Sequence, residues 1–294
     1  MLQVARLAPK LLGDSVELVR NFFLARQNTD GGFKDRDGKS DLYYTVFGID
    51  GLAALQAEIP AAKIESFLRE FGTGEKLDFI HLCCLARCWS ALSEGRATRV
   101  PDFEIDLREK VLKRMETFRS RDGGYNIFPN SETGTVYGAF LAVAACTDLH
   151  APILDPLRIV QSLKFLETND GAWSNDRMLK IGSTNATAAA VTLLRNLGMP
   201  IDAAVGDWIL QQAHPEGGFR AAPDSPIPDL LSTATALHAL AGMERSFGGV
   251  KEKCLDFIDS LWTNEGGFHG HWADDHLDCE YTYYGLLALG HLSL

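Results

Sequence analysis

The sequence predicts an all-α fold: six helical hairpins that form an inner and an outer ring of helices and close into a barrel. Three observations predict it. A short motif of Gly-Gly followed by an aromatic residue recurs along the chain, each copy follows an amphipathic stretch, and each precedes an apolar stretch rich in small residues. Self-similarity at a fixed spacing is the signature of repeat architectures. We therefore expect one domain over residues 1–294.

The repeated motif marks the turn inside each hairpin. Five copies, QNTDGGF, RSRDGGY, LETNDGAW (with Gly-Ala in place of Gly-Gly), AHPEGGF and WTNEGGF, place these turns near residues 31–33, 123–125, 171–173, 217–219 and 266–268. Glycine supplies the left-handed backbone that ends a helix, and the aromatic side chain is expected to plug the hairpin. The interval between Phe33 and Tyr125 is about twice the others. A degenerate second repeat at about 60–95, containing KIESFLREFGTG and LDFIHLCCLARCWSAL, fills this interval.

The two helices of each hairpin differ in character. The first, for example VELVRNFFLARQ, has apolar residues at i, i+3 and i+4, as expected for a helix with one exposed face. The second, for example STATALHALAG, is nearly free of charge and rich in Ala, Leu and Thr, so it is expected to be buried nearly all round. Short polar side chains precede the inner helices as N-cap candidates: Asp41, Thr135, Ser183, Ser232 and Asp278.

The ends of the array favour a closed barrel over an open solenoid. An open array needs terminal repeats with a polar outer face. The last repeat instead ends in YTYYGLLALGHLSL, which is apolar to its final residue. A short helix predicted over 4–12 is a candidate cover for one end of the barrel. Closure removes the exposed ends and makes the first and last hairpins neighbours.

Composition and charge exclude several classes of protein. The chain has 294 residues, of which 46% are hydrophobic and 23% charged, and this balance excludes a disordered chain. The formal net charge of −11 argues against a nucleic-acid partner. No apolar run approaches the roughly 20 residues of a membrane span. Six cysteines without a C-x-x-C pair favour a reducing compartment, so we expect a cytoplasmic protein.

The repeats resemble a known family. The form x-[DE]-G-G-[FYW], followed by a loop and by D-x-x-x-T-x-x-x-x-x-A-L, is similar to the α/α toroid family, which contains the β subunits of protein prenyltransferases and the squalene and oxidosqualene cyclases. The resemblance to a prenyltransferase β subunit is closer, because one toroid fills the chain whereas triterpene cyclases carry two. It implies a transferase that binds an isoprenoid diphosphate and pairs with a helical α-type subunit or an acceptor protein.

The resemblance also implies a metal site. In prenyltransferase β subunits an Asp, a Cys and a His hold a zinc ion that activates the acceptor thiolate. The matching positions here are Asp278, Glu280 and Tyr44, which become candidate catalytic residues. With two neighbouring residues added, the candidate metal ligands are Asp278, Cys279, Glu280 and His276. Two carboxylates and a phenol suit Mg²⁺ better than zinc. We therefore expect a divalent metal and leave open whether it is Zn²⁺ or Mg²⁺.

Basic and aromatic residues near the same seam are the candidate substrate-binding residues. Arg36 and Lys39 stand three and six residues after Phe33, the spacing of the family's phosphate-binding Arg and Lys. A guanidinium and an ammonium group would stabilise the departing diphosphate. Aromatic faces suit an isoprenyl chain and an allylic cation, although core packing is the alternative role for several of them. The aromatic candidates are Tyr43, Tyr281 and Tyr284.

The sequence thus predicts an isoprenoid-binding enzyme. Prenyl transfer, with the diphosphate leaving at the mouth of the barrel, is the leading hypothesis, and two alternatives remain open. One is a terpene cyclase-like enzyme that uses the apolar barrel, although the D-x-D-D motif of cyclases that protonate their substrate is absent. The other is a non-catalytic toroid that binds a partner protein, which the loss of two of the family's three zinc ligands favours.

Overall fold

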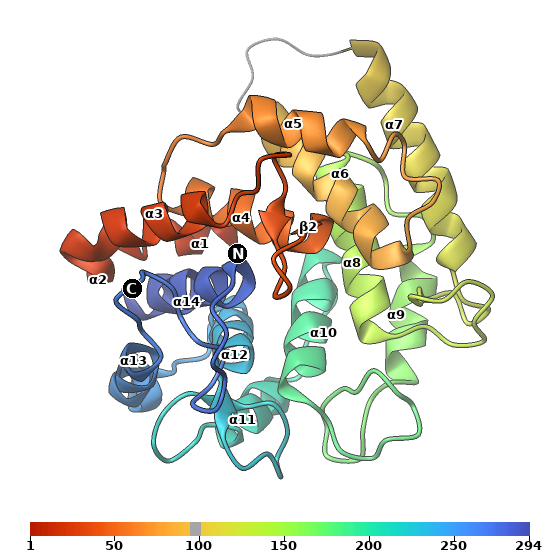
Figure 1. Ribbon diagram of the computed structural model, residues 1–294. Coiled ribbons are helices and arrows are strands. Elements are labelled where there is room, and N and C mark those ends of the chain that lie inside the picture. Colours follow the sequence, from red (N-terminus) through yellow and green to blue (C-terminus); the bar gives the residue numbers. More distant parts are fainter. Residues whose placement is uncertain (95–100) are drawn as a thin grey trace.

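The computed structural model describes residues 1–94 and 101–294, and nearly all of its regular structure is helical (Figure 1). Within these residues, an outer helix is followed by an inner helix six times along the chain, and we call each such consecutive pair a hairpin. The outer helices are α3 (Val16–Ala25), α5 (Ala61–Arg69), α7 (Pro101–Met115), α9 (Pro156–Lys164), α11 (Ala203–Gln211) and α13 (Lys251–Ser260). The inner helices are α4 (Leu42–Ala54), α6 (Phe79–Glu94), α8 (Val136–Asp148), α10 (Thr184–Asn196), α12 (Leu230–Gly242) and α14 (Cys279–Leu292).

The inner helices stand around a common axis, with the outer helices outside them (Figure 1). Each inner helix contacts the next one along the chain, and α14 contacts α4 in turn. The first and last hairpins are therefore neighbours. The degenerate repeat supplies the second hairpin, α5 and α6, and its last predicted residue, 95, lies outside the described residues.

Outer and inner helices differ in burial because their sequences differ. On α3 the buried side chains are Val19, Phe22 and Phe23, at i, i+3 and i+4, and the other positions are at least partly exposed. The inner helix α4 is buried along most of its length. Its small residues let the turn approach, since a Cβ on Gly48 would lie 2.3 Å from the ring of Phe33. Small residues on the inner ring thus permit close packing against the turns.

A threonine at the start of four inner helices holds the aromatic residue of the turn. In the first hairpin the backbone N–H of Phe33 donates to the Thr45 hydroxyl at 3.0 Å, and this hydroxyl donates to the Asp41 carbonyl at 2.6 Å. The same N–H-to-threonine bond recurs at Trp173–Thr187, Phe219–Thr233 and Phe268–Thr282. The turn glycine is also constrained: Gly31 has φ 101°, and a Cβ there would lie 2.0 Å from the carbonyl oxygen of Lys63.

Two loops that lead into inner helices form short antiparallel strand pairs, which the all-α prediction did not include. The pairs are β1 (Phe33–Lys34) with β2 (Ser40–Asp41), and β3 (Phe219–Arg220) with β4 (Pro228–Asp229). In each pair the aromatic residue of the turn lies opposite an aspartate, Phe33 opposite Asp41 and Phe219 opposite Asp229. Each aspartate ends its strand and is followed at once by an inner helix, so the strands leave the helical architecture unchanged.

Most of the predicted N-caps are confirmed. The side chains that cap inner helices as expected are Asp41, Thr135, Ser183 and Asp278. The predicted cap Ser232 is wrong. The helix α12 already begins at Leu230, where β4 ends, and Asp229 is its N-cap, accepting a hydrogen bond from the Ser232 N–H at 2.7 Å.

The N-terminal segment covers one end of the inner ring. The helix predicted over 4–12 is divided into α1 (Leu2–Ala5) and α2 (Pro9–Leu12), and α1 contacts both α14 and α4. Near the C-terminal end of α14, a Cβ on Gly290 would lie 2.1 Å from the carbonyl oxygen of Val4. Within residues 1–94 and 101–294, none of the helices has the length and apolar character needed to cross a membrane.

Candidate functional site

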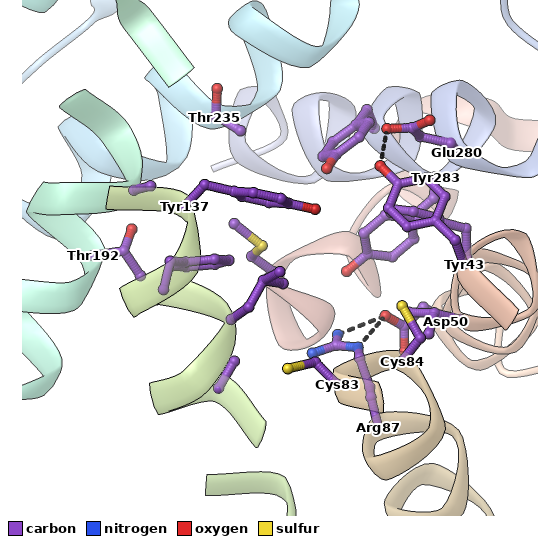
Figure 2. A pocket seen from close by; sticks show the side chains of 18 of the residues that line it. Tyr43, Asp50, Cys83, Cys84, Arg87, Tyr137, Thr192, Thr235, Glu280 and Tyr283 are labelled. Atoms are coloured by element: carbon purple, nitrogen blue, oxygen red, sulfur yellow. Dashed lines mark hydrogen bonds and ion pairs between the residues drawn. The ribbon is translucent and has the colours of Figure 1, made fainter. Parts of the chain in front are cut away.

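A cavity of about 400 Å³ lies between the inner helices, and each of the six contributes to its lining (Figure 2). The lining side chains recur at the second, fifth, sixth and ninth positions of these helices. Residues three, four and seven positions apart lie on one face of an α-helix, so these positions face the cavity together. They form three layers of cavity-lining side chains: the second position, the fifth with the sixth, and the ninth. We call the end formed by the N-termini of the inner helices the mouth, and the opposite end the base.

The three layers differ in chemistry. The mouth layer consists of Tyr43, Tyr137, Asn185, Leu231 and Glu280. The middle layer, mostly apolar and aromatic, consists of Val46, Phe47, Cys83, Cys84, Phe140, Leu141, Ala188, Ala189, Thr235, Tyr283 and Tyr284. The base layer includes Asp50, Arg87, Ala144 and Thr192. An apolar cavity with a few polar groups is the usual form of a small-molecule site, and the volume lies within the roughly 300–1,000 Å³ typical of such sites.

The carboxyl group of Glu280 lies inside the mouth layer. The Tyr43 hydroxyl donates a hydrogen bond to Glu280 Oε1 at 2.5 Å (Figure 2). Burial raises the pKa of Glu280 to about 7; the bond from Tyr43 opposes this shift, and the negative charge of Asp278 adds to it. A carboxyl group with a pKa near neutrality can both donate and accept a proton at physiological pH.

Aromatic rings border this carboxyl group. The ring of Phe47 lies 5.0 Å from that of Tyr43, 5.8 Å from that of Tyr283 and 5.5 Å from that of Tyr284, measured between centroids. These rings come from α4 and α14, the inner helices of the first and last hairpins. Their faces are suited to an isoprenyl chain and to a cation that forms on it.

Arg36 and Asp278 meet at the rim of the mouth. Arg36 Nε donates to Asp278 Oδ2 at 2.9 Å, and Arg36 Nη2 donates to Asp274 Oδ2 at 3.1 Å. Asp278 also accepts from the N–H of Tyr281 as the N-cap of α14. Burial alone would lower the pKa of Arg36, but the charges of Asp278 and Asp274 outweigh it and raise the pKa. Both predicted residues are thus already engaged by protein groups, while Lys39 lies exposed on the same loop.

The predicted aromatic residues divide between the cavity and the rim. Tyr43 and Tyr284 line the cavity as expected. Tyr281 lies outside it, and the guanidinium carbon of Arg36 stands 5.5 Å from its ring centroid. Tyr44 is also outside the lining; burial raises its pKa to about 12, with the charge of Asp278 acting in the same direction. Only part of the predicted substrate-binding set therefore faces the cavity.

The four predicted metal ligands point to different places. Cys279 is completely buried, Glu280 faces the cavity, and Asp278 binds Arg36 at the rim. His276 is exposed, with Nδ1 3.4 Å from Asp274 Oδ1. Across residues 1–94 and 101–294, no group of three His, Cys, Asp or Glu side chains could hold a metal ion. Consecutive helix residues face different directions, so this set does not fit a metal ion in the arrangement observed.

A histidine between two aspartates forms a second cluster near the helix N-termini. His81 Nε2 lies 3.1 Å from Asp41 Oδ2, and His81 Nδ1 lies 2.8 Å from Asp78 Oδ2. The bond to Asp41 raises the pKa of His81 to about 9, against the opposing effect of burial and with further support from Asp78. This cluster joins the caps of the first two inner helices and is an ordinary structural contact.

Sequence reasoning missed a buried ion pair at the base of the cavity. Asp50 is 3% exposed, and Arg87 donates to its Oδ2 from Nη2 at 2.6 Å and from Nε at 3.1 Å (Figure 2). The charge of Asp50 is the main cause of the raised pKa of Arg87. Both residues occupy the ninth position of consecutive inner helices. A charged residue at the ninth position of two consecutive, largely apolar inner helices is the signal that could have found them.

Solved structures share the fold. The type II terpene cyclase MstE from Scytonema, in complex with its product merosterolic acid A, matches with a TM-score of 0.61 at 13% identity over 97% of each chain. Its complex with the substrate geranylgeranyl dihydroxybenzoate matches with a TM-score of 0.60 at 12% identity, again over 97% of each chain. A polysaccharide lyase matches with a TM-score of 0.65 at 12% identity over 97% of each chain. A search among curated proteins found no match.

One family model connects the sequence to this fold. The model of the prenyltransferase alpha-alpha toroid domain matches residues 10–84 and 186–293, which is more than half of the chain. The matched parts contain the first and last hairpins, whose inner helices carry Tyr43 and Glu280. The unmatched segment between them, 85–185, contains most of α6, the third hairpin and the outer helix of the fourth. The resemblance seen in the repeats is confirmed, and the chain belongs to the prenyltransferase α/α toroid domain family.

Proposed function

We propose that the protein is an enzyme that binds an isoprenoid inside a closed barrel of six hairpins and transfers a proton to it from Glu280. One observation carries the proposal: a carboxyl group with a pKa of about 7 faces a mostly apolar, aromatic cavity. Such a group is protonated in a substantial fraction of molecules at neutral pH, where an exposed carboxyl group is ionised. The reaction class is an acid-initiated cyclisation or isomerisation.

The chemistry requires no co-reactant. The π electrons of a carbon–carbon double bond take the proton of Glu280, which leaves a carbocation on the neighbouring carbon. The faces of Phe47 and Tyr284 stabilise this cation, and the hydroxyl of Tyr43 stabilises the new carboxylate by the hydrogen bond that it already donates. Loss of a proton from an adjacent carbon to the carboxylate then restores the acid and leaves a rearranged or cyclised hydrocarbon chain.

Two comparisons support this proposal without deciding the reaction. The chain has the fold of MstE, a type II terpene cyclase whose substrate carries a geranylgeranyl chain. The chain also belongs to the toroid domain family of prenyltransferases. At 12–13% identity the structural likeness shows the fold alone, which a polysaccharide lyase shares, so the choice of ligand and of reaction depends on the residues of this chain.

Prenyl transfer from an isoprenoid diphosphate is the second candidate. The N-termini of the inner helices surround the mouth, and helix N-termini favour anions. Arg36 and Lys39 lie on a loop at the same rim. The engagement of Arg36 by Asp278 and Asp274 leaves less of its charge for a diphosphate, which ranks this candidate below proton transfer. Prenyl transfer would also need an acceptor molecule, which the protein would bind either alone or together with a helical α-type subunit.

A labelling experiment separates the two reactions. The protein is incubated in D₂O with farnesol and, separately, with farnesyl diphosphate, and products are analysed by mass spectrometry together with released diphosphate. Proton transfer from Glu280 predicts a product that gains deuterium at carbon, and no such product from Glu280→Gln. Diphosphate release that survives Glu280→Gln and needs an acceptor supports prenyl transfer. Binding of both compounds without any product supports a non-catalytic toroid.

A further inference from the structure

The base of the cavity contains hydrogen-bonding groups that the protein leaves unused. Arg87 directs Nε and Nη2 at one oxygen of Asp50, and its third nitrogen, Nη1, has no hydrogen-bond partner in the described parts of the chain. The Arg87 side chain is 33% exposed although inner helices surround it, because it borders the cavity. A guanidinium edge at the base is therefore open to a ligand.

A buried hydroxyl points to the same conclusion independently. Tyr283 is 2% exposed and lines the cavity, and within residues 1–94 and 101–294 its hydroxyl has no hydrogen-bond partner. The charges of Asp50 and Arg87 both act on this hydroxyl, which places it close to their ion pair (Figure 2). Native proteins rarely leave a buried polar group unpaired, and a functional role is one of the reasons when they do.

Charge indicates the kind of group that fits there. Of the described side chains that line the cavity, Arg87 is the one Lys or Arg, and it is already paired with Asp50. Asp148 and Glu280 add acidic groups, and the α-amino group of Met1 adds at most one positive charge. A diphosphate inside the cavity would therefore lack the cations that its charge requires. An uncharged group that accepts and donates hydrogen bonds matches the base better.

We propose that the base of the cavity is a subsite for the hydroxyl group of an uncharged isoprenoid alcohol. The hydroxyl oxygen accepts from Arg87 Nη1, and its proton is donated to the Tyr283 oxygen or to Asp50. Asp50 and Tyr43 lie seven residues apart on α4, which separates the two ends of the cavity by roughly 10 Å along the helix. The substrate therefore has its hydroxyl group at the base and its reacting double bond beside Glu280. This inference rests on the proposed function.

Binding of three matched probes tests the subsite. The probes are farnesol, the hydrocarbon β-farnesene and farnesyl diphosphate, each titrated into the protein and followed by its tryptophan fluorescence. Because one or two hydrogen bonds distinguish the alcohol from the hydrocarbon, we expect farnesol to bind roughly five- to tenfold more tightly than farnesene. Farnesyl diphosphate should bind no more tightly than farnesene.

Two tyrosine variants provide the matched comparison. Tyr283→Phe should bring farnesol close to the affinity of farnesene, while farnesene binding stays as in the wild type. It removes an unpaired hydroxyl and keeps the ring, so a thermal melt at or above that of the wild type will show that it folds. Tyr281→Phe removes a hydroxyl from the same helix outside the cavity and should keep the preference for the alcohol.

The outcomes separate the subsite from the proposed function. If farnesol and farnesene bind equally well, if Tyr283→Phe keeps the preference, or if the diphosphate binds most tightly, the subsite is refuted while an isoprenoid cavity remains. If neither farnesol nor farnesene binds at micromolar protein concentrations, both the subsite and the proposed function are refuted.

Discussion

The rim and the interior of the cavity each contain an arginine–aspartate pair that joins two hairpins, and the pairs differ in how many acids the arginine binds and in their surroundings. At the rim, Arg36 binds Asp278 and Asp274, and Asp278 also caps α14. Inside, Arg87 directs two nitrogens at one oxygen of Asp50, and its third nitrogen borders the cavity. The Arg36 guanidinium is divided between two acids at the exposed rim, whereas the Arg87 guanidinium binds one acid and borders the cavity.

Two acids of the last hairpin repeat this contrast. Asp278 and Glu280 are two residues apart and therefore lie on different sides of α14. Asp278 accepts hydrogen bonds from Arg36 and from a backbone N–H. Glu280 faces the cavity, where burial raises its pKa to about 7. Neighbouring carboxyl groups thus take different roles because their surroundings differ.

The largest expected effect concerns catalysis at Glu280. Glu280→Gln should lower the rate of product formation by roughly 100- to 10,000-fold, the usual contribution of general acid–base catalysis, because the amide has no proton to transfer. Product yield over time, measured by gas chromatography with mass spectrometry, gives the rate. Arg36→Gln tests the rim in the same assay. A large loss at Arg36 with little loss at Glu280 would reverse the roles of the two regions and favour diphosphate chemistry.

The next largest effect concerns the stability of the two ion pairs. Arg87→Met should lower the free energy of unfolding by roughly 3–5 kcal/mol, because it leaves Asp50 buried without its partner. Arg36→Met should cost about 1 kcal/mol, since partly exposed ion pairs contribute little. Urea denaturation followed by circular dichroism measures both changes. Equal losses for the two variants would show that the rim pair is as strongly desolvated as the inner one.

A smaller effect is the pH dependence that Glu280 gives to stability. Its pKa of about 7 in the folded protein lies above the reference value of 4.5, so the folded state keeps a proton that the unfolded state has lost. Stability should therefore fall as the pH rises from about 4.5 to 7, by at most about 3 kcal/mol. Glu280→Gln should reduce this fall in urea denaturation curves recorded at both ends of the range. An unchanged pH dependence in the variant would place Glu280 in contact with water.

The smallest effect belongs to His81, outside the cavity. Its pKa of about 9 lies above the reference value of 6.5, so its contribution to stability is complete below pH 6.5 and is lost as the pH rises through 9. Because His81 is partly exposed, we expect about 1 kcal/mol. His81→Asn should reduce the free energy of unfolding at pH 6 and have little effect at pH 9.5. A loss of the same size at both pH values would mean that the charge of His81 does not contribute.

The architecture was predictable because it depends on short-range patterns. The turn motif, the alternation of amphipathic and small-residue helices and four of the five proposed caps all involve residues close together in the chain. The site was predicted only in part. The sequence identified Tyr43 as a candidate substrate-binding residue and Glu280 as a candidate catalytic residue and metal ligand, and it did not identify Asp50 or Arg87. A single charge in an apolar helix has no visible partner until the neighbouring helix is known.

By itself, the sequence determined the repeated hairpins and which helices are amphipathic and which are rich in small residues, because turn chemistry and helix periodicity are local properties. Only the tertiary structure decided which side chains share the cavity and which acids keep a proton. Tyr43 and Glu280 are 237 residues apart in the chain, yet they share a hydrogen bond. The pKa of a carboxyl group depends on burial and on charged neighbours, and both are set by packing between the first and last hairpins.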